Sequence, residues 1–343
     1  MKPKLVIGAN GFLGSHVTRQ LVAGGADVRV LVRPTANTRG IDDLSVERFH
    51  GDLFETETLR RAMDGCDVVY HCAVDTRAWL RDPAPLFRAN VEGLRNVLDV
   101  ARSRDLCRFV FTSSYVTIGR RRGRRATEDD KYTWRRSHGP YPLSRLQAEE
   151  LVLRYAAECG LPAVAMCVST TYGAGDWGGT PHGSFIAGAV FGKLPFNMAG
   201  IELEVVGVDD AARALILAAE RGRTGQRYII SEKMMPLTEV VRIAADEAGM
   251  PPPRRSIPLP LLYGLGALGT VKARFSSSGG EQLSLKSVRM MRMESEVDHG
   301  KAIRELGWHP EPVEDSIRAA ARFWMEIAKA SRKSRKSKAA QPD

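Results

Sequence analysis

The sequence lacks any apolar run that approaches the roughly 20 residues a membrane-spanning helix needs. Its longest apolar stretch, residues 258–271, is shorter and contains three glycines. A secretory leader is also missing, because the opening MKPKLVIGANG passes directly from lysines into a short apolar run and a glycine loop. We therefore expect no membrane-spanning helix and a mature protein that begins near Met1.

Paired cysteines and metal-ligand clusters are missing as well. None of the five cysteines stands in a C-x-x-C spacing, and no group of His, Cys and carboxylate residues has the spacing of a metal site. The G-x-S-x-G segment that is typical of one class of hydrolases is absent. We predict reduced thiols, a cytoplasmic location and no metal site.

Acidic residues are too few to balance the basic ones, which leaves a formal net charge of +10. The excess gathers in two segments rather than along a groove: residues 120–125, which hold five arginines, and the tail 329–343. This distribution indicates no specific nucleic-acid partner. We predict that the tail is disordered and solvated, with a weak attraction to anionic membrane or nucleic acid as the alternative.

Short apolar runs alternate with helical patterns through the first half of the chain. Strands are expected at 4–7, 28–32, 47–49, 68–72, 108–112 and 163–168, with helices up to 23, at 91–102 and at 143–158. Runs this short and unbroken, joined by helices, favour a parallel sheet that is covered on both faces. The predicted fold class is α/β, a Rossmann-like doubly wound parallel sheet with ligands at the carboxyl ends of its strands.

A glycine loop follows the first predicted strand. Gly8, Gly11 and Gly14 are spaced three residues apart in IGANGFLGSH, at the N-terminus of a predicted helix. Such glycines allow a tight turn and a close approach to a pyrophosphate, which the helix N-terminus attracts. We predict dinucleotide binding by this loop, including Asn10, Phe12 and Leu13, with a purely structural loop as the alternative.

The second predicted strand ends in Val32-Arg33-Pro34, where an acidic residue would favour the ribose 2′-hydroxyl of NAD. A guanidinium at this point suits a 2′-phosphate, so NADP(H) is favoured over NAD(H). The alternative is that Arg33 stacks on adenine and accepts either cofactor. Asp52, with Leu53 in HGDL, is placed to accept from the adenine amino group or to cap a helix.

After Tyr172 the alternation of strand and helix patterns ends, and glycines and prolines interrupt residues 173–200. We assign residues 1–172, joined by 201–222, to an NADP(H)-binding Rossmann domain. Residues 173–200 and 223–328 are predicted to form a smaller substrate lobe, ahead of the tail. The apolar stretch 258–268 is compatible with a hydrophobic binding pocket or a contact with a membrane surface, and a buried core helix is the alternative.

Several motifs in order resemble the extended short-chain dehydrogenase/reductases of the NAD-dependent epimerase/dehydratase type. They are IGANGFLG, HGDL, HCAV, ANVEGLRNVL, FTSS and a tyrosine followed four residues later by a basic residue. The resemblance is nearest to dihydroflavonol reductase-like and 3β-hydroxysteroid dehydrogenase-like members. It covers about residues 4–325, because VVGVDDAARA and KAIRELGWHP also look like late segments of that family.

The resemblance implies a reaction centre of Ser114, with Ser113 beside it, Tyr141 and Arg145. Arg145 stands where the family has a lysine, and its i, i+4 spacing places it on one helix face with Tyr141. A free phenol holds its proton too tightly to exchange it readily at neutral pH, so a nearby cation is needed. Arginine keeps the charge but is bulkier, which leaves reduced or redirected catalysis open. Tyr132 with Arg136 offers the same spacing as a second choice.

The same resemblance implies further contacts. Ala73, Val74, Thr112, Val168 and Thr170 (or Thr171), with Tyr141 and Arg145, would contact the cofactor. Asp75, Thr76, Trp79, Ser114 and Tyr172 would contact the substrate. Asn90 either shapes the central helix around a bound water or simply starts a helix, and His71 is expected to be a core histidine.

The predicted function is an NADP(H)-dependent oxidoreductase that interconverts a ketone and a secondary alcohol on a hydrophobic, steroid-, flavonoid- or isoprenoid-like molecule. One alternative is a sugar-nucleotide epimerase or dehydratase with retained NAD, which would use the arginine cluster 120–125 or basic residues of the second lobe for a diphosphate. Another is a non-catalytic NADP(H)-binding regulator. The sequence leaves open a homodimer and a peripheral contact with a membrane surface.

Overall fold

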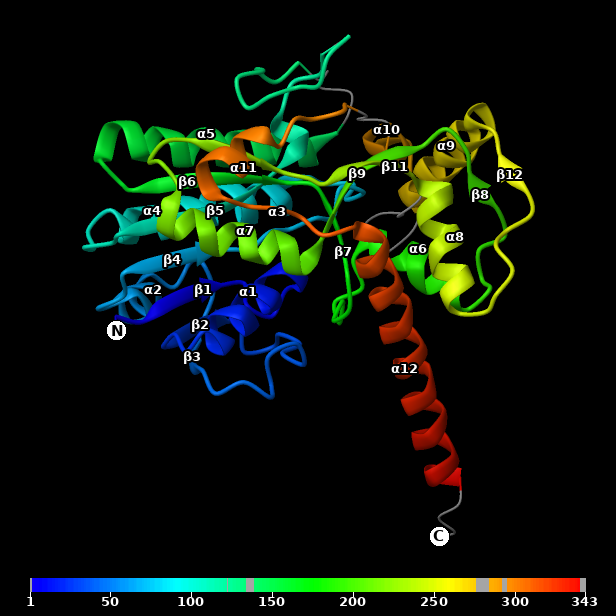
Figure 1. The fold of residues 1–343 in the computed structure, drawn as a ribbon, viewed down its shortest axis with the longest axis horizontal. Helices are drawn as coiled ribbons and strands as arrows, with labels where there is room; N and C mark the ends of the chain where they lie inside the picture. The colour runs from blue at the N-terminus through cyan, green and yellow to red at the C-terminus, as the bar shows by residue number, and fades with distance from the viewer. Residues whose placement is uncertain (1, 122, 134–138, 276–283, 292–294, 340–343) are drawn as a thin grey trace.

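A seven-stranded parallel sheet organises the first part of the protein in the computed structural model, which describes residues 2–121, 123–133, 139–275, 284–291 and 295–339. Its strands are β1 (Lys4–Ile7), β2 (Val28–Val32), β3 (Glu47–His50), β4 (Val68–His71), β5 (Arg108–Ser114), β6 (Ala163–Val168) and β10 (Arg227–Ile230). They lie in the order β10-β6-β5-β4-β1-β2-β3 (Figure 1). The order reverses between β1 and β4, which creates the crevice where doubly wound sheets bind ligands. The predicted fold class is confirmed.

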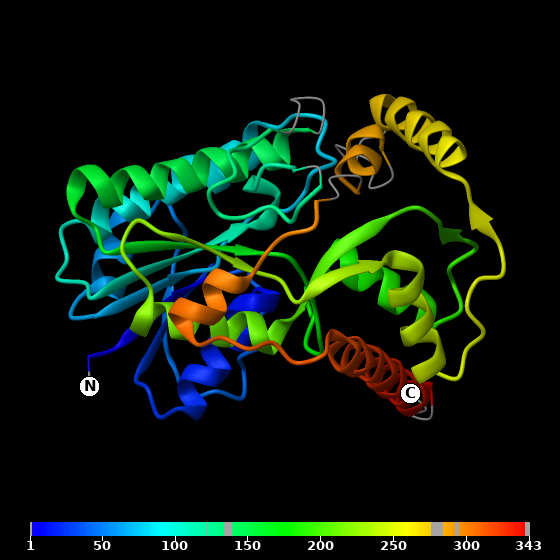
Figure 2. The same ribbon diagram turned by 45° about the horizontal axis from the view of Figure 1, so that its top comes forward.

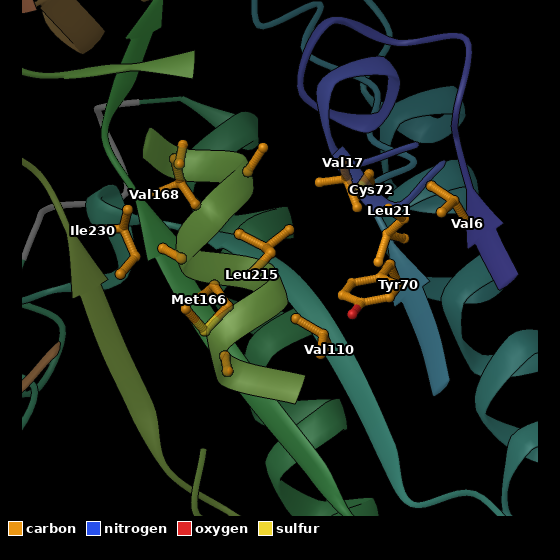
Figure 3. Close-up of a cluster of buried hydrophobic side chains, with 14 of the residues drawn as sticks. Val6, Val17, Leu21, Tyr70, Cys72, Val110, Met166, Val168, Leu215 and Ile230 are labelled. Carbon is orange, nitrogen blue, oxygen red and sulfur yellow. The ribbon is translucent and has the colours of Figure 1, made fainter. Parts of the chain in front are cut away.

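Helices cover both faces of this sheet because successive residues of its central strands, such as β4 and β6, are buried on both sides. Helices α1 (Phe12–Ala23) and α7 (Val208–Arg221) cover one face, where Leu215 lies beside Met166 and Val110 (Figure 3). Helices α2 (Thr56–Met63), α4 (Leu94–Ala101) and α5 (Pro140–Cys159) cover the other. All six residues of β6 are buried, which explains its unbroken apolar sequence.

A second, smaller lobe lies beside the sheet (Figure 2). Its three-stranded sheet has β9 (Glu202–Gly207) between β7 (Thr170–Tyr172) and β11 (Lys233–Pro236), and β8 (Asn197–Met198) pairs with β12 (Ser256–Ile257). Its helices are α6 (Pro181–Val190), α8 (Leu237–Glu247), α9 (Leu259–Phe275), α10 (Leu285–Met291) and α12 (Val313–Ala339). One apolar cluster that includes Val205, Val240 and Ile317 holds these elements together.

The structure corrects three boundaries predicted from the sequence. Residues 227–230 form β10 at the edge of the large sheet, although they were assigned to the substrate lobe. Within 201–222 only α7 packs on the large sheet, whereas β9 pairs with strands of the small lobe. Residues 329–339 continue helix α12 where disorder was predicted, since Ala, Lys and Arg are strong helix formers that extend an anchored helix. No helix in the described ranges is long and apolar enough to cross a membrane.

Candidate active site

The predicted site residues gather at the carboxyl edge of the large sheet. Strands β1, β4, β5 and β6 end there, at Ile7, His71, Ser114 and Val168. Ser114 is opposite Val168 in the β5–β6 register, and Ile7 is opposite His71 in the β1–β4 register. Loops that follow neighbouring parallel strands therefore meet at this edge, beside the reversal of strand order.

The glycine loop packs so closely that side chains would not fit. Gly8 adopts a φ of 84°, and a Cβ there would lie 2.6 Å from the backbone nitrogen of Ala73. A Cβ on Gly14 would lie 2.2 Å from the carbonyl oxygen of Gly8. Helix α1 begins at Phe12, and its N-cap, Gly11, makes no side-chain capping hydrogen bond. Close packing alone is compatible with both alternatives, a purely structural loop and a dinucleotide-binding loop. The N-terminus of α1, which no side chain caps, favours the second, because its free N–H groups suit the diphosphate of a dinucleotide.

The remaining loop residues line the same region. Asn10, Phe12 and Leu13 are half-buried around the start of α1, Ala73 is half-buried against Gly8, and Val74 is exposed. Their positions are those expected for cofactor contacts, which stay a prediction.

Arg33 is exposed directly after β2. Its charge reaches Asp75, which follows β4: burial would raise the pKa of Asp75, but the hydrogen bonds and charge of Arg77, with the charge of Arg33, lower it. The Arg77–Asp75 ion pair, at 2.6 Å, is a contact that sequence analysis missed. Arg33 therefore lies at the carboxyl edge, where the predicted 2′-phosphate contact requires it.

Asp52 does not cap a helix. Its carboxylate accepts a hydrogen bond from the backbone N–H of Phe54 at 2.7 Å, whereas α2 begins at Thr56 with Glu55 as its N-cap. The capping alternative is therefore wrong, and the adenine contact stays a prediction. Leu53 beside it is half-buried, and its side chain packs against Gly93.

The predicted reaction centre combines a strand end with a helix start. Ser114 is the last residue of β5 and is half-buried. Helix α5 begins at Pro140, so Tyr141 lies in its first turn, and α5 packs against β5 and the short helical turn Tyr115–Thr117 after Ser114. The fold thus brings the segments of Ser114 and Tyr141 to one place, although the two residues are far apart in the chain.

Arg145 is buried behind this centre, with an exposed fraction of 2%. Its Nη2 donates a hydrogen bond to the carbonyl oxygen of Thr112 in β5. Burial lowers the pKa of Arg145, while the neighbouring Tyr141, Glu149 and Cys167 oppose that shift. The cation therefore lies within electrostatic reach of Tyr141, as the i, i+4 spacing predicts.

For the second candidate pair, Tyr132 and Arg136, the structure describes only the tyrosine. Tyr132 is half-buried, and burial raises its pKa. Arg136, its predicted partner, lies outside the described residues.

Asn90 joins the loop after β4 to the reaction-centre helix. Its Nδ2 donates to the Asp75 carbonyl oxygen at 2.9 Å and to Ser144 Oγ at 3.1 Å, and its Oδ1 accepts from the Asp75 N–H at 2.8 Å. Asn90 lies within the π-helical segment Arg88–Gly93, which continues α3 (Ala84–Phe87). The alternative that Asn90 merely starts a helix is therefore wrong.

Sequence analysis missed Glu149, a buried carboxylate one turn beyond Arg145. It accepts hydrogen bonds from Ser113 Oγ, Thr117 Oγ1 and the Cys167 thiol, and it forms an ion pair with Arg227 at 3.2 Å. This network holds the residue before Ser114 against α5. The signal was available, because Glu149 continues the 141–145 spacing along one helix face.

Three residues that were predicted to contact substrate or cofactor are more buried than residues that line a binding site usually are. Tyr172 is 1% exposed in the apolar cluster of the small lobe, and burial raises its pKa, so its predicted substrate contact does not match this structure. Val168 and Thr170 are each 6% exposed: Val168 lies in β6 between β5 and β10, and Thr170 lies in β7, which pairs with β9. Thr171 is half-buried.

The loop after β4 carries the other substrate candidates. Thr76 is exposed and Trp79 is half-buried. Lys286 of α10 donates to the carbonyl oxygen of Leu80 at 3.1 Å, so this loop also contacts the small lobe. His71, just before the loop, is 2% exposed, and burial, with the charge of Arg145, lowers its pKa to about 3. His71 is thus a neutral core residue, as expected.

A hollow of about 300 Å³ lies elsewhere, near α11 (Gly300–Leu306). Residues of both charge signs line it, among them Glu128, Arg223 and Lys301, and none of the predicted site residues is among them. We base the site on the strand ends, because this hollow has neither a glycine loop nor a hydroxyl pair.

Comparison with known proteins agrees with this geometry. The family model described as NAD dependent epimerase/dehydratase family matches residues 4–231. The chain belongs to that family. The resemblance drawn from the motifs is thereby confirmed, and the residues that the family model covers include Ser114, Tyr141 and Arg145.

Two relatives and one solved structure match nearly the whole chain. A "Putative dihydroflavonol 4-reductase" of Synechocystis sp. is 30% identical and covers 94% of both chains. Sterol demethylase protein B of Methylococcus capsulatus is 26% identical over 94% of this chain and 98% of its own. The crystal structure of gox2253 is 33% identical, with a TM-score of 0.82, over 95% of this chain and 99% of that one. Family and relatives together support an NAD(P)-dependent oxidoreductase or epimerase.

Proposed function

We propose that this protein is an NADP(H)-dependent oxidoreductase that interconverts a ketone and a secondary alcohol on a hydrophobic small molecule. The observation that supports the proposal is that α5, which carries Tyr141 and Arg145, packs against β5, which ends at Ser114, at the sheet edge where the uncapped start of α1 also lies. A hydroxyl and a phenol beside a buried cation can hold and protonate a carbonyl oxygen.

The cofactor would be held by residues that already lie at this edge. The loop Gly8 to Gly14 would hold the diphosphate, Arg33 the 2′-phosphate, and Asp52 the adenine. Ala73, Val74, Thr112 and Thr171 would contact its nicotinamide end. When bound, NADP(H) would supply or accept the hydride.

The protein's own groups handle the proton. Ser114 donates a hydrogen bond to the substrate oxygen, and Tyr141 passes its phenolic proton to that oxygen during reduction. Arg145 stabilises the phenolate that remains, because its guanidinium stays charged and is held in place by the Thr112 carbonyl. His71 takes no part in proton transfer, since burial keeps it neutral.

Two observations favour a hydrophobic substrate. Sterol demethylase protein B, by its name, acts on a sterol, and it matches this chain along nearly its whole length. Trp79, on the loop beside the site, offers a large apolar surface that is only half-buried.

A sugar-nucleotide epimerase is the second candidate, because the family includes such enzymes. It would need cations for a diphosphate, and the cluster 120–125 was one of the two sources predicted for them, beside basic residues of the second lobe. Arg121 and Arg124 instead bind the buried carboxylate of Asp130, and Arg125 pairs with Glu296 at 2.6 Å. Arg33 also fits poorly with the acidic strand end that NAD-retaining enzymes use. A non-catalytic regulator remains the third candidate because of Arg145.

One experiment separates the three candidates. The purified protein is denatured to detect retained nucleotide, then titrated with NADPH and NADH, and turnover is followed over a panel of apolar ketones. We expect no retained NAD, tighter NADPH binding and ketone-dependent NADPH oxidation that Tyr141→Phe reduces by about 10²–10⁴-fold without loss of NADPH affinity. Retained NAD would favour the epimerase, and binding without turnover would favour the regulator.

Arg33→Ser tests the cofactor preference separately. We expect NADPH affinity to fall at least about tenfold, or 1.4 kcal/mol, while NADH affinity stays unchanged. Arg39→Ser is the matched control, because Arg39 is exposed in the same loop but lies over the Trp177 ring at 5.8 Å. Equal effects of the two variants, or none from Arg33→Ser, would reject the phosphate role.

A further inference from the structure

Helix α9 of the small lobe carries an apolar face that points to solvent. Leu261, Leu268 and Val271 are 54%, 67% and 53% exposed, and they are the three most exposed large apolar residues in the described part of the chain. With Gly264, which is also exposed, they repeat every three or four residues and therefore lie on one side of the helix. A helix at the surface normally turns polar residues outward, so this face calls for a partner.

The opposite side of α9 already serves the core. Leu262 is fully buried, and a Cβ on Gly266 would lie 3.0 Å from the Val288 side chain of α10. The outward leucines and valine are thus additional to the residues that fold the lobe. The core of the lobe is filled by other apolar residues and does not need these three side chains.

The charge around α9 has one sign. Residues 248–280 contain no Asp or Glu, whereas Arg254 and Arg255 precede the helix and Lys272 and Arg274 lie in its last turn. Arg254, Arg255 and Lys272 are exposed. An exposed apolar stripe with basic residues at both ends is therefore the surface that α9 offers.

We propose that this face of α9 docks on an anionic lipid surface, with Leu261, Leu268 and Val271 in the headgroup–acyl boundary and Arg254, Arg255 and Lys272 against anionic headgroups. Three partly exposed side chains give only weak, reversible binding by themselves. The basic flanks supply the second attraction that stable association with a membrane needs. This docking surface does not depend on the reaction that the site performs.

A second copy of the chain fits this face less well. A symmetric dimer would bring Arg254 and Arg255 of both copies to one interface, and residues 248–280 contain no acidic residue that could pair with these arginines. A stable protein interface also needs roughly 800 Å² from each partner, which a single three-residue stripe does not supply. Anionic lipid complements both the apolar and the basic part.

The test is co-sedimentation of the full-length protein with vesicles of phosphatidylcholine alone or mixed with phosphatidylglycerol. We expect binding to the mixed vesicles, and at least a tenfold lower partition coefficient for Leu261→Glu/Leu268→Glu. Phe191→Glu is the matched control, because Phe191 is a 36% exposed apolar residue elsewhere in the small lobe. Unchanged thermal unfolding and NADPH binding show that each variant folds.

The basic end of α12 needs its own control, since it attracts anionic vesicles by charge alone. Figure 1 places that end far from α9, so the two contributions are separable. A tail variant, in which Gln replaces the basic residues from Lys329 to Lys338, should still bind the mixed vesicles. Adding Leu261→Glu/Leu268→Glu to this tail variant should remove that binding. The proposal is overturned if the α9 variant binds as the parent does, or if the tail variant binds no vesicles. It is also overturned if light scattering shows a dimer that only the α9 variant dissociates.

Discussion

The guanidinium carbon of Arg145 lies 5.1 Å from the ring centroid of Phe111, while its Nη2 donates to the next residue's carbonyl oxygen, at Thr112. A flat cation between an aromatic ring and a carbonyl uses the shape of arginine as well as its charge. The contacts at this position therefore suit arginine, where the resemblance drawn from the sequence implies a lysine.

We predict that Arg145→Met lowers kcat/KM at least about 10²-fold, because the cation that stabilises the Tyr141 phenolate is removed. Arg145→Lys keeps the charge and should retain more activity than the methionine variant. Steady-state kinetics of both variants measure this, with thermal unfolding as a folding control. Equal activity of Arg145→Met and the parent would remove Arg145 from the reaction.

Gly14→Ala should abolish dinucleotide binding. The new Cβ would lie 2.2 Å from the Gly8 carbonyl oxygen, so the loop and the start of α1 must separate. Gly178→Ala is the control, since no atom lies within 4 Å of a Cβ there. Fluorescence titration with NADPH should show lost binding for the first variant only. Normal affinity in Gly14→Ala would argue that the loop does not hold the cofactor.

Asn90→Ala should destabilise the protein by about 1–3 kcal/mol, because a buried donor and acceptor of Asp75 lose their partner. It should also lower kcat/KM, since Asn90 ties Ser144 of α5 to the loop after β4. Denaturant unfolding and kinetics measure the two effects. Asn96→Ala, which removes one hydrogen bond to Leu53, is the control and should affect stability only.

Stability should depend on pH through Glu204. Burial raises the pKa of this carboxyl from 4.5 to about 6, while Ser231 Oγ and the Val297 N–H donate to it. The folded state therefore binds the Glu204 proton more tightly than the unfolded state. As pH rises from 4.5 to about 6, the unfolded carboxyl ionises first, and the folded protein loses about 2 kcal/mol from this group.

Glu204→Gln keeps the hydrogen-bonding shape without the ionisation. Denaturant unfolding between pH 4 and 7 should show the parent losing about 2 kcal/mol relative to the variant, with a constant difference outside that range. A pH-independent difference between the two proteins would contradict the raised pKa.

Sequence analysis reached the fold class because its signals are local. Unbroken apolar runs such as 163–168, joined by helices, allow few arrangements other than a covered parallel sheet. The glycine spacing and the ordered motifs also pointed to the dinucleotide loop and to the family. Boundaries were harder: 227–230 could join either sheet, because a four-residue apolar run does not encode its neighbour.

The sequence by itself determined the fold class and the glycine loop and supplied the candidates for the reacting groups, since each is recognised from a short local pattern of residues. Only the tertiary structure decided which groups are buried and paired. It buried Tyr172, joined Asn90 to Ser144, and placed Glu149 under Ser113 and beside Arg227. These contacts join segments that are distant in the chain, and their strength depends on exclusion of water, which only the packed fold provides.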